Sequence, residues 1–135
     1  MITVNKIDDV IKLAQIKEVT YNENSYASYS SLNLELGTNL ENLSFDDVKS
    51  LRIIMYLGKD EDHNRDLKPI KIYENLKKFS ETLERKTKSL EIDQILEKLP
   101  LATYLINGKN ILKLWFFVKK VNFSIPVDLQ YMFLN

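Results

Sequence analysis

The chain has 135 residues, a length that fits a single domain spanning residues 1–135. Nineteen lysines and arginines balance nineteen aspartates and glutamates, so no net charge draws the chain toward nucleic acid or acidic lipid. The lack of cysteine excludes a disulfide framework, a thiolate nucleophile and a cysteine-ligated zinc site. The first residues show no signal-peptide pattern, and the longest apolar run is too short to span a bilayer. We therefore expect a cytoplasmic protein with no membrane span.

The N-terminal segment carries apolar residues at helical spacing from about Lys6 to Val19. Thr3 or Asn5 is placed to cap this first helix. The apolar stripe of the helix is expected to comprise Ile7, Val10, Ile11 and Ala14. The opposite face carries Lys12 and Lys17.

Residues 20–42 are rich in serine and asparagine, a composition that favours a loop over a helix. Within them, Leu32, Leu34 and Leu36 alternate with polar residues, which is the spacing of a strand. We therefore expect a short extended segment near residues 28–37 that lays its leucines on the core. A short hairpin is the alternative.

One segment carries the residues of a complete helix, from its start to its stop. Ser44 suits the N-cap, and Asp46 and Asp47 place negative charge at the positive end of the helix dipole. Gly58 suits a left-handed stop. Apolar residues recur at spacings of three and four, which predicts a buried stripe of Phe45, Val48, Leu51, Ile54 and Met55. This pattern predicts that a central, capped helix lies near residues 45–57.

A further helix is expected to begin at Pro69, because the N–H that proline lacks would be unpaired in the first turn. It is expected to run to about Lys88. The apolar positions predicted to face the core are Ile72, Tyr73, Leu76, Phe79 and Leu83.

The C-terminal third of the chain is predicted to hold the remaining helices. Residues 90–99 form one of them, and Pro100 ends it. A short helix follows that is expected to stop at Asn107-Gly108, before a strongly apolar helix over residues 110–121. Together these elements predict an all-α fold, a compact bundle of five or six helices around the central one.

Two segments carry a family resemblance. Tyr56-Leu57-Gly58-Lys59 ends the central helix, and residues 100–108 read Pro-Leu-Ala-Thr-Tyr-Leu-Ile-Asn-Gly. They resemble a family of small uncharacterised proteobacterial helical domains. In that family an apolar helix ends in an aromatic-Leu-Gly-Arg-Gly turn, and a later segment reads Pro-x-Leu-Ala-x-aromatic-Leu-x-x-Gly. The resemblance implies a helical domain in a bacterial protein, and it implies no activity.

No motif for catalysis or cofactor binding stands out. The three glycines lie far apart in the sequence, which excludes a phosphate-binding loop, and no nucleophile elbow occurs. Alternate positions of the acidic loop 60–66 match the start of an EF-hand. Arg65 and Lys71 stand where that motif needs glycine and glutamate. We expect a solvated loop, with no metal, no cofactor and no catalytic residues.

The apolar C-terminal segment, residues 110–135, is the main functional clue. A helix that is apolar on every side must be covered by the rest of the fold, by another subunit or by a membrane surface. Consecutive helical residues point about 100° apart, so a single face cannot hide three adjacent aromatic side chains. We expect an interaction or regulatory module that forms a homodimer, with an interface that includes Trp115, Phe116, Phe117, Tyr131 and Phe133.

The alternative function is weak nucleic-acid binding. Four basic residues cluster on or near the helix expected over residues 69–88, namely Lys77, Lys78, Arg85 and Lys86. Glutamates interleave with them and reduce the field that a phosphate group would feel. Protein–protein interaction is therefore the first expectation.

Overall fold

The computed structural model describes residues 2–22, 26–59, 69–82, 87–119 and 132. These residues form helices and short turns, with no strand among them, so the predicted all-α class is confirmed. The helices are α1 (Val4–Asn22), α2 (Tyr26–Glu41), α3 (Phe45–Lys59), α4 (Pro69–Thr82), α5 (Lys88–Leu96) and α6 (Leu101–Lys119).

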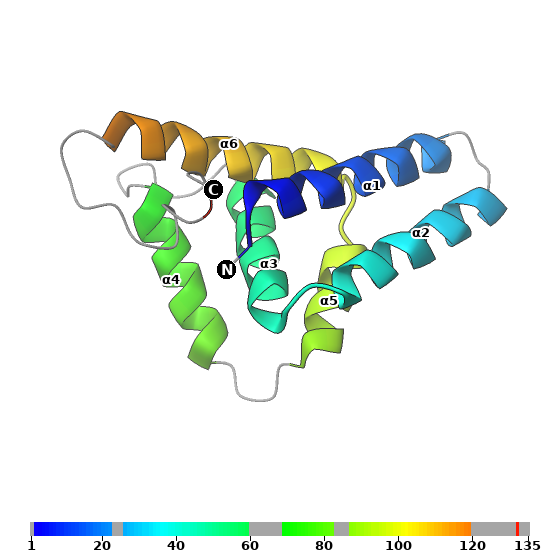
Figure 1. Ribbon diagram of the computed structural model, residues 1–135, viewed down its shortest axis with the longest axis horizontal. Helices are drawn as coiled ribbons and strands as arrows, with labels where there is room; N and C mark the ends of the chain where they lie inside the picture. The colour runs from blue at the N-terminus through cyan, green and yellow to red at the C-terminus, as the bar shows by residue number, and fades with distance from the viewer. Residues whose placement is uncertain (1, 23–25, 60–68, 83–86, 120–131, 133–135) are drawn as a thin grey trace.

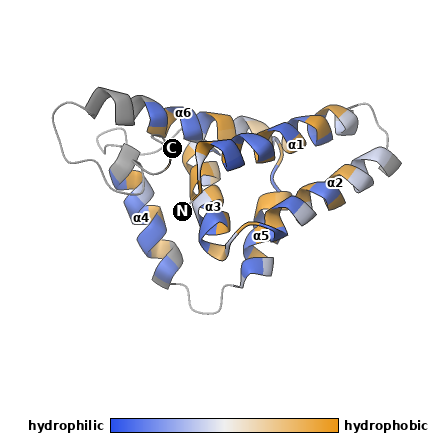
Figure 2. Ribbon diagram, viewed as in Figure 1, coloured by the Kyte–Doolittle hydropathy of each residue, from blue (hydrophilic) through white to orange (hydrophobic). Residues whose placement is uncertain are grey.

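The helices are arranged around α3, as the sequence predicted. Figure 1 shows α1 and α6 along one side of the molecule, with α3 leading away from them between α4 and α5. Helix α2 packs against α1 and α5. Figure 2 shows hydrophobic positions concentrated along α3 and where α2 and α5 meet. The buried core therefore has α3 as its axis.

The start of α3 confirms its predicted cap. The backbone N–H of Asp47 donates to Ser44 Oγ at 3.0 Å, and the N–H of Val48 donates to the Ser44 carbonyl at 3.0 Å. The predicted stripe is buried apart from Phe45, which is half-buried. Burial extends further than the stripe, because Ile53 and Leu57 on other faces are also buried. A helix buried on most of its sides fits the central position.

The extended segment expected near residues 28–37 is wrong, because these residues lie within α2. Leu36 and Leu40 are both 0 % exposed and lie one helical turn apart on the buried face. Leu34 is 72 % exposed, which the alternation of a strand would not allow. Leu32 and Leu36 fit both periods, because they are an even number of residues apart and also one helical turn apart, and packing against α1 and α5 selects the helix.

The stop expected at Asn107-Gly108 is also wrong, because α6 continues unbroken through both residues. Gly58 likewise lies inside α3, and no glycine among the described residues has a positive φ. Both glycines serve close packing instead. A Cβ on Gly58 would overlap the carbonyl oxygen of Tyr104, and a Cβ on Gly108 would overlap that of Ile54. The two helices cross at these glycines.

The middle of the chain differs from the prediction at two points. Helix α4 begins at Pro69 as predicted but ends at Thr82, and Lys88 is the first residue of α5. The Thr87 side chain caps α5 by accepting the N–H of Leu90 at 3.2 Å. On α4, Tyr73 is buried as predicted. Phe79 was predicted to face the core, but it is 59 % exposed. Leu83 lies outside the described residues.

Candidate binding surface along α3

One narrow side of α3 remains partly open to solvent. It carries Phe45, Lys49, Arg52, Tyr56 and Lys59, which follow one another at spacings of three and four residues. We call these five residues the α3 stripe. Every other position of α3 except Asp46 is buried. The stripe therefore combines two aromatic and three cationic side chains on the one face of the central helix that the fold leaves accessible.

Cations of the stripe lie over its aromatic rings. Lys49 Nζ is 4.2 Å from the centre of the Phe45 ring, and the guanidinium carbon of Arg52 is 5.1 Å from the centre of the Tyr56 ring. Two further amino groups approach Tyr56, Lys59 Nζ at 5.8 Å and Lys98 Nζ at 5.7 Å. Each distance is within the range of cation–π attraction. Tyr56 is thus the centre of a small positively charged cluster.

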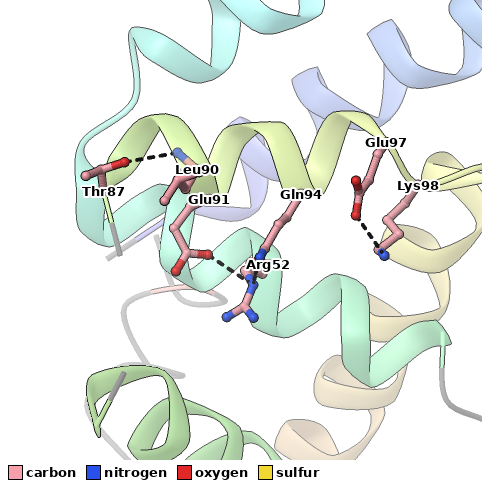
Figure 3. Close-up of polar contacts among 7 residues, drawn as sticks. All are labelled: Arg52, Thr87, Leu90, Glu91, Gln94, Glu97 and Lys98. Carbon is pink, nitrogen blue, oxygen red and sulfur yellow. Dashed lines mark hydrogen bonds and ion pairs between the residues drawn. The ribbon is translucent and has the colours of Figure 1, made fainter. Parts of the chain in front are cut away.

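A buried ion pair fixes Arg52 from the side of α5. Its Nε lies 3.0 Å from Glu91 Oε2 and 2.7 Å from Gln94 Oε1. Glu91 is 0 % exposed and the Arg52 side chain is 11 % exposed. Figure 3 shows Glu91 and Gln94 reaching down from α5 to Arg52 on α3, and the terminal nitrogens of Arg52 pointing on toward α4. The pair joins the two helices and sets the direction of the guanidinium.

A groove lies between α3 and α4 on the other side of this pair. Its lining comprises Arg52, Ile53 and Tyr56 from α3 and Leu76 and Phe79 from α4, around a cavity of about 260 Å³. Four of these side chains are apolar or aromatic, and the fifth carries a fixed cation. Such a groove can hold a group that is partly apolar and partly anionic.

The predicted interface residues fall largely outside what the structure describes. The backbone of residues 115–117 belongs to α6, and the side chains of Trp115, Phe116 and Phe117 are not described. Tyr131 and Phe133 lie outside the described residues. The described part of the C-terminal segment is mixed, with Leu112 and Met132 at 0 % exposure and Ile111 at 36 %.

The residues of the nucleic-acid alternative are only partly described. Lys77 and Lys78 are exposed neighbours on α4, whereas Arg85, Lys86 and the acidic loop 60–66 lie outside the described residues. Within the described ranges, no group of three histidine, cysteine, aspartate or glutamate side chains is arranged to hold a metal ion. No helix in the same ranges is long and apolar enough to cross a bilayer.

Lys17 is the residue that the sequence interpretation placed most wrongly. The sequence predicted that Lys17 lies on the face of the first helix opposite its apolar stripe. In the structure Lys17 is buried, with only 1 % of it exposed. Its Nζ donates to Asn33 Oδ1 at 2.9 Å and to the Leu96 carbonyl at 3.2 Å. Burial lowers the pKa of the amino group below its ordinary value of 10.5, and the adjacent Glu18 carboxylate opposes the shift.

Lys17 and Glu18 together hold the junction between α5 and α6. Lys17 binds the carbonyl of the last residue of α5, where the helix dipole is negative. Glu18 Oε1 accepts the N–H of Ala102 at 2.8 Å in the first turn of α6, where the dipole is positive. This geometry assigns both side chains a structural role. Nothing in the sequence of α1 alone indicates this role, because Leu96 and Ala102, the residues that the two side chains bind at the junction, lie in the distant C-terminal half.

No family model, no curated protein and no solved structure matches the chain. The resemblance to the proteobacterial helical family therefore stays a prediction.

Proposed function

We propose that this protein is a non-catalytic interaction module of the bacterial cytoplasm that self-associates through its apolar C-terminal segment. The continuity of α6 through Lys119 carries the proposal. Trp115, Phe116 and Phe117 are consecutive residues of one helix, so their positions are about 100° apart around its axis. A second copy related by a two-fold axis is the simplest way to cover such a set.

The burial pattern earlier in α6 supports the same proposal. Its buried positions are Leu101, Ala102, Leu105, Gly108 and Leu112, on a helix that packs against α1, α3 and α4. Ile111 is 36 % exposed, and Trp115 follows it by four positions, about one helical turn. An apolar line that starts at the edge of the core and continues past it is typical of a subunit interface.

The test compares two double variants by sedimentation. Trp115→Ala with Phe117→Ala should shift the mass from two chains toward one at micromolar concentration, with the helical circular dichroism signal retained. Ile16→Ala with Leu34→Ala is the matched control, because both side chains are large, apolar and more than half exposed on other helices. The control should leave the mass of two chains unchanged. Dissociation of the control alone, or no effect of the first variant on a dimer, would contradict the proposal.

Weak nucleic-acid binding is the second candidate. It is supported by the exposed lysines 77 and 78 on α4, the helix that packs beside the positively charged α3 stripe. Lys77→Glu with Lys78→Glu should weaken binding of a fluorescent single-stranded oligonucleotide, and affinity should fall steeply with salt. An anisotropy signal that stays flat at low salt would remove this candidate.

A further inference from the structure

Asn107 and Gly108 form the one asparagine–glycine pair of the chain. Asparagine is chemically labile, and glycine is the neighbour that hinders its reaction least, because glycine has no Cβ and adopts the widest range of backbone angles. The reaction joins the backbone nitrogen of residue 108 to the side-chain carbonyl carbon of residue 107 in a five-membered ring. The pair was expected to end a helix, but it lies in the interior of α6, where the fold controls whether the ring can form.

Helix α6 holds the nitrogen of Gly108 away from this reaction. Within an α-helix the N–H of Gly108 donates to the carbonyl of Tyr104, four residues earlier. Ring closure requires the peptide plane between Asn107 and Gly108 to rotate away from helical angles, and this rotation breaks the hydrogen bond. The nitrogen can therefore react only after this part of α6 opens.

Helix α3 covers the same nitrogen from outside. A Cβ on Gly58 would overlap the backbone nitrogen of Gly108 as well as the carbonyl oxygen of Tyr104. A Cβ on Gly108 would in turn overlap the carbonyl oxygen of Ile54. Because backbone lies against backbone here, the peptide between residues 107 and 108 can rotate only when the two helices separate. Local opening of α6 and loss of its crossing with α3 are therefore one event.

We propose that Asn107–Gly108 is a latent modification site, which deamidates when α6 separates from α3 and is protected while the two helices are packed. The backbone nitrogen of Gly108 forms a bond to Cγ of Asn107, and the bond between Cγ and the side-chain nitrogen breaks. The proton that Gly108 gives up leaves with that nitrogen as ammonia. Water is the second reactant, and it opens the ring at either carbonyl to give aspartate or isoaspartate.

The isoaspartate product makes the modification one-way for the fold. Its main chain runs through the side-chain carbons, which adds one methylene to the backbone of α6 between residues 107 and 108. The hydrogen-bonding groups on either side of the added carbon then no longer align along the helix. The crossing has no space even for a Cβ at Gly108, so the lengthened backbone cannot pack there again. The inference does not depend on self-association of the chain.

The first measurement compares deamidation in the folded and the unfolded chain. The full chain is kept in mildly alkaline buffer with and without guanidinium chloride. Mass spectrometry then follows the tryptic peptide 99–109, whose one asparagine is Asn107. Asn107 should convert at least about tenfold more slowly in the folded chain, because the rate follows the fraction of open molecules. A smaller difference would overturn the proposal.

Two glycine variants test the part played by the crossing. Gly58→Ala should speed the conversion of Asn107 in buffer at least about fivefold, because the added methyl group separates the helices. Gly37→Ala is the control, since a Cβ at that position makes only an ordinary contact, and its rate should stay within about twofold of the unaltered chain. An unchanged rate in Gly58→Ala, or equal acceleration in both variants, would overturn the role of α3.

The products test the one-way step without relying on a glycine variant. The isoaspartyl chain is separated by chromatography and refolded beside Asn107→Asp, which carries the same charge without the added methylene. Asn107→Asp should keep the helical circular dichroism signal and a cooperative urea transition. The isoaspartyl chain should unfold at a clearly lower urea concentration. Equal midpoints for the two chains would overturn the one-way step.

Discussion

Gly58 of α3 and Gly108 of α6 lie face to face at the crossing of the two helices. A Cβ atom on either would occupy the place of a backbone carbonyl on the other helix, that of Tyr104 or that of Ile54. No side chain separates the helices at this point, so they pack at close backbone distance. This contact connects the central helix to the helix that leads into the proposed interface, and its geometry makes the first prediction.

Gly58→Ala and Gly108→Ala should each lower the free energy of unfolding by about 3 kcal/mol or more, because backbone atoms must move to admit the methyl group. Gly37→Ala is the matched control, because Gly37 is the remaining glycine of the chain and also lies inside a helix. Its Cβ would meet only Leu96 Cδ1 at 3.6 Å, an ordinary contact. Alanine in the α2 interior should therefore stabilise the fold by about 0.5–1 kcal/mol. Urea unfolding of the three variants checks the order, and equal effects at all three positions would contradict the crossing.

The buried Lys17 makes a prediction about pH. Its pKa is lowered in the folded state, so the unfolded chain holds this proton more tightly. Between the lowered pKa and 10.5, the contribution of Lys17 to the free energy of unfolding should therefore rise with pH.

The measurement compares the native chain with Lys17→Met in urea at about pH 7 and about pH 10. The stability of the native chain relative to Lys17→Met should increase at the higher pH. Lys12→Met removes an exposed lysine from the same helix, and its difference from the native chain should not change in this way. A Lys17→Met difference that is constant over this interval, or that moves in the opposite direction, would show that the amino group is not buried as described.

The Arg52–Glu91 pair should behave as a coupled unit. Arg52→Ala removes the cation beside a carboxylate that is 0 % exposed, at a cost of about 3 kcal/mol. Arg52→Met with Glu91→Met replaces both charges by apolar groups and should come within about 1 kcal/mol of the native chain. A double-mutant cycle measured by urea unfolding gives the coupling. Single-variant costs that simply add would count against a direct pair.

The helix cap at Ser44 should be measurable separately from the core. Ser44→Ala removes the acceptor of the Asp47 N–H and should cost about 1 kcal/mol in thermal or urea unfolding, whereas Ser44→Gly should cost only a few tenths. Ser89→Ala replaces an exposed serine in the first turn of α5 that caps nothing and should stay within about 0.5 kcal/mol. Equal costs for Ser44→Ala and Ser89→Ala would contradict the capping role.

The features that could be predicted from the sequence are those set by neighbouring residues. Ser44, the following aspartates and the apolar spacing all lie within one stretch, and together they located the central helix correctly. The start of α4 at Pro69 was local in the same sense. The fold class followed because such helical periods recur along most of the chain.

The errors concern residues whose partners are distant in the sequence. Gly108 looked like a helix stop, but a glycine is needed there because the backbone carbonyl of Ile54 on α3 leaves no space for a Cβ atom. Lys17 looked solvent-facing on α1, but Asn33 and Leu96 enclose its amino group.

The α3 stripe was the one site feature that local spacing could have given. Phe45, Lys49, Arg52, Tyr56 and Lys59 follow a helical period, although the sequence analysis identified only the buried stripe of this helix. The role of Glu91 behind Arg52 could not be read locally, because the two residues lie on different helices.

The most direct test of the proposed function is the mass of the unaltered chain in solution. Light scattering across a dilution series should give two chains of 15.9 kDa each at micromolar concentration, with a fall toward one chain on strong dilution. A mass of one chain at every concentration, together with a Trp115 fluorescence spectrum typical of a buried indole, would contradict self-association through the C-terminal segment.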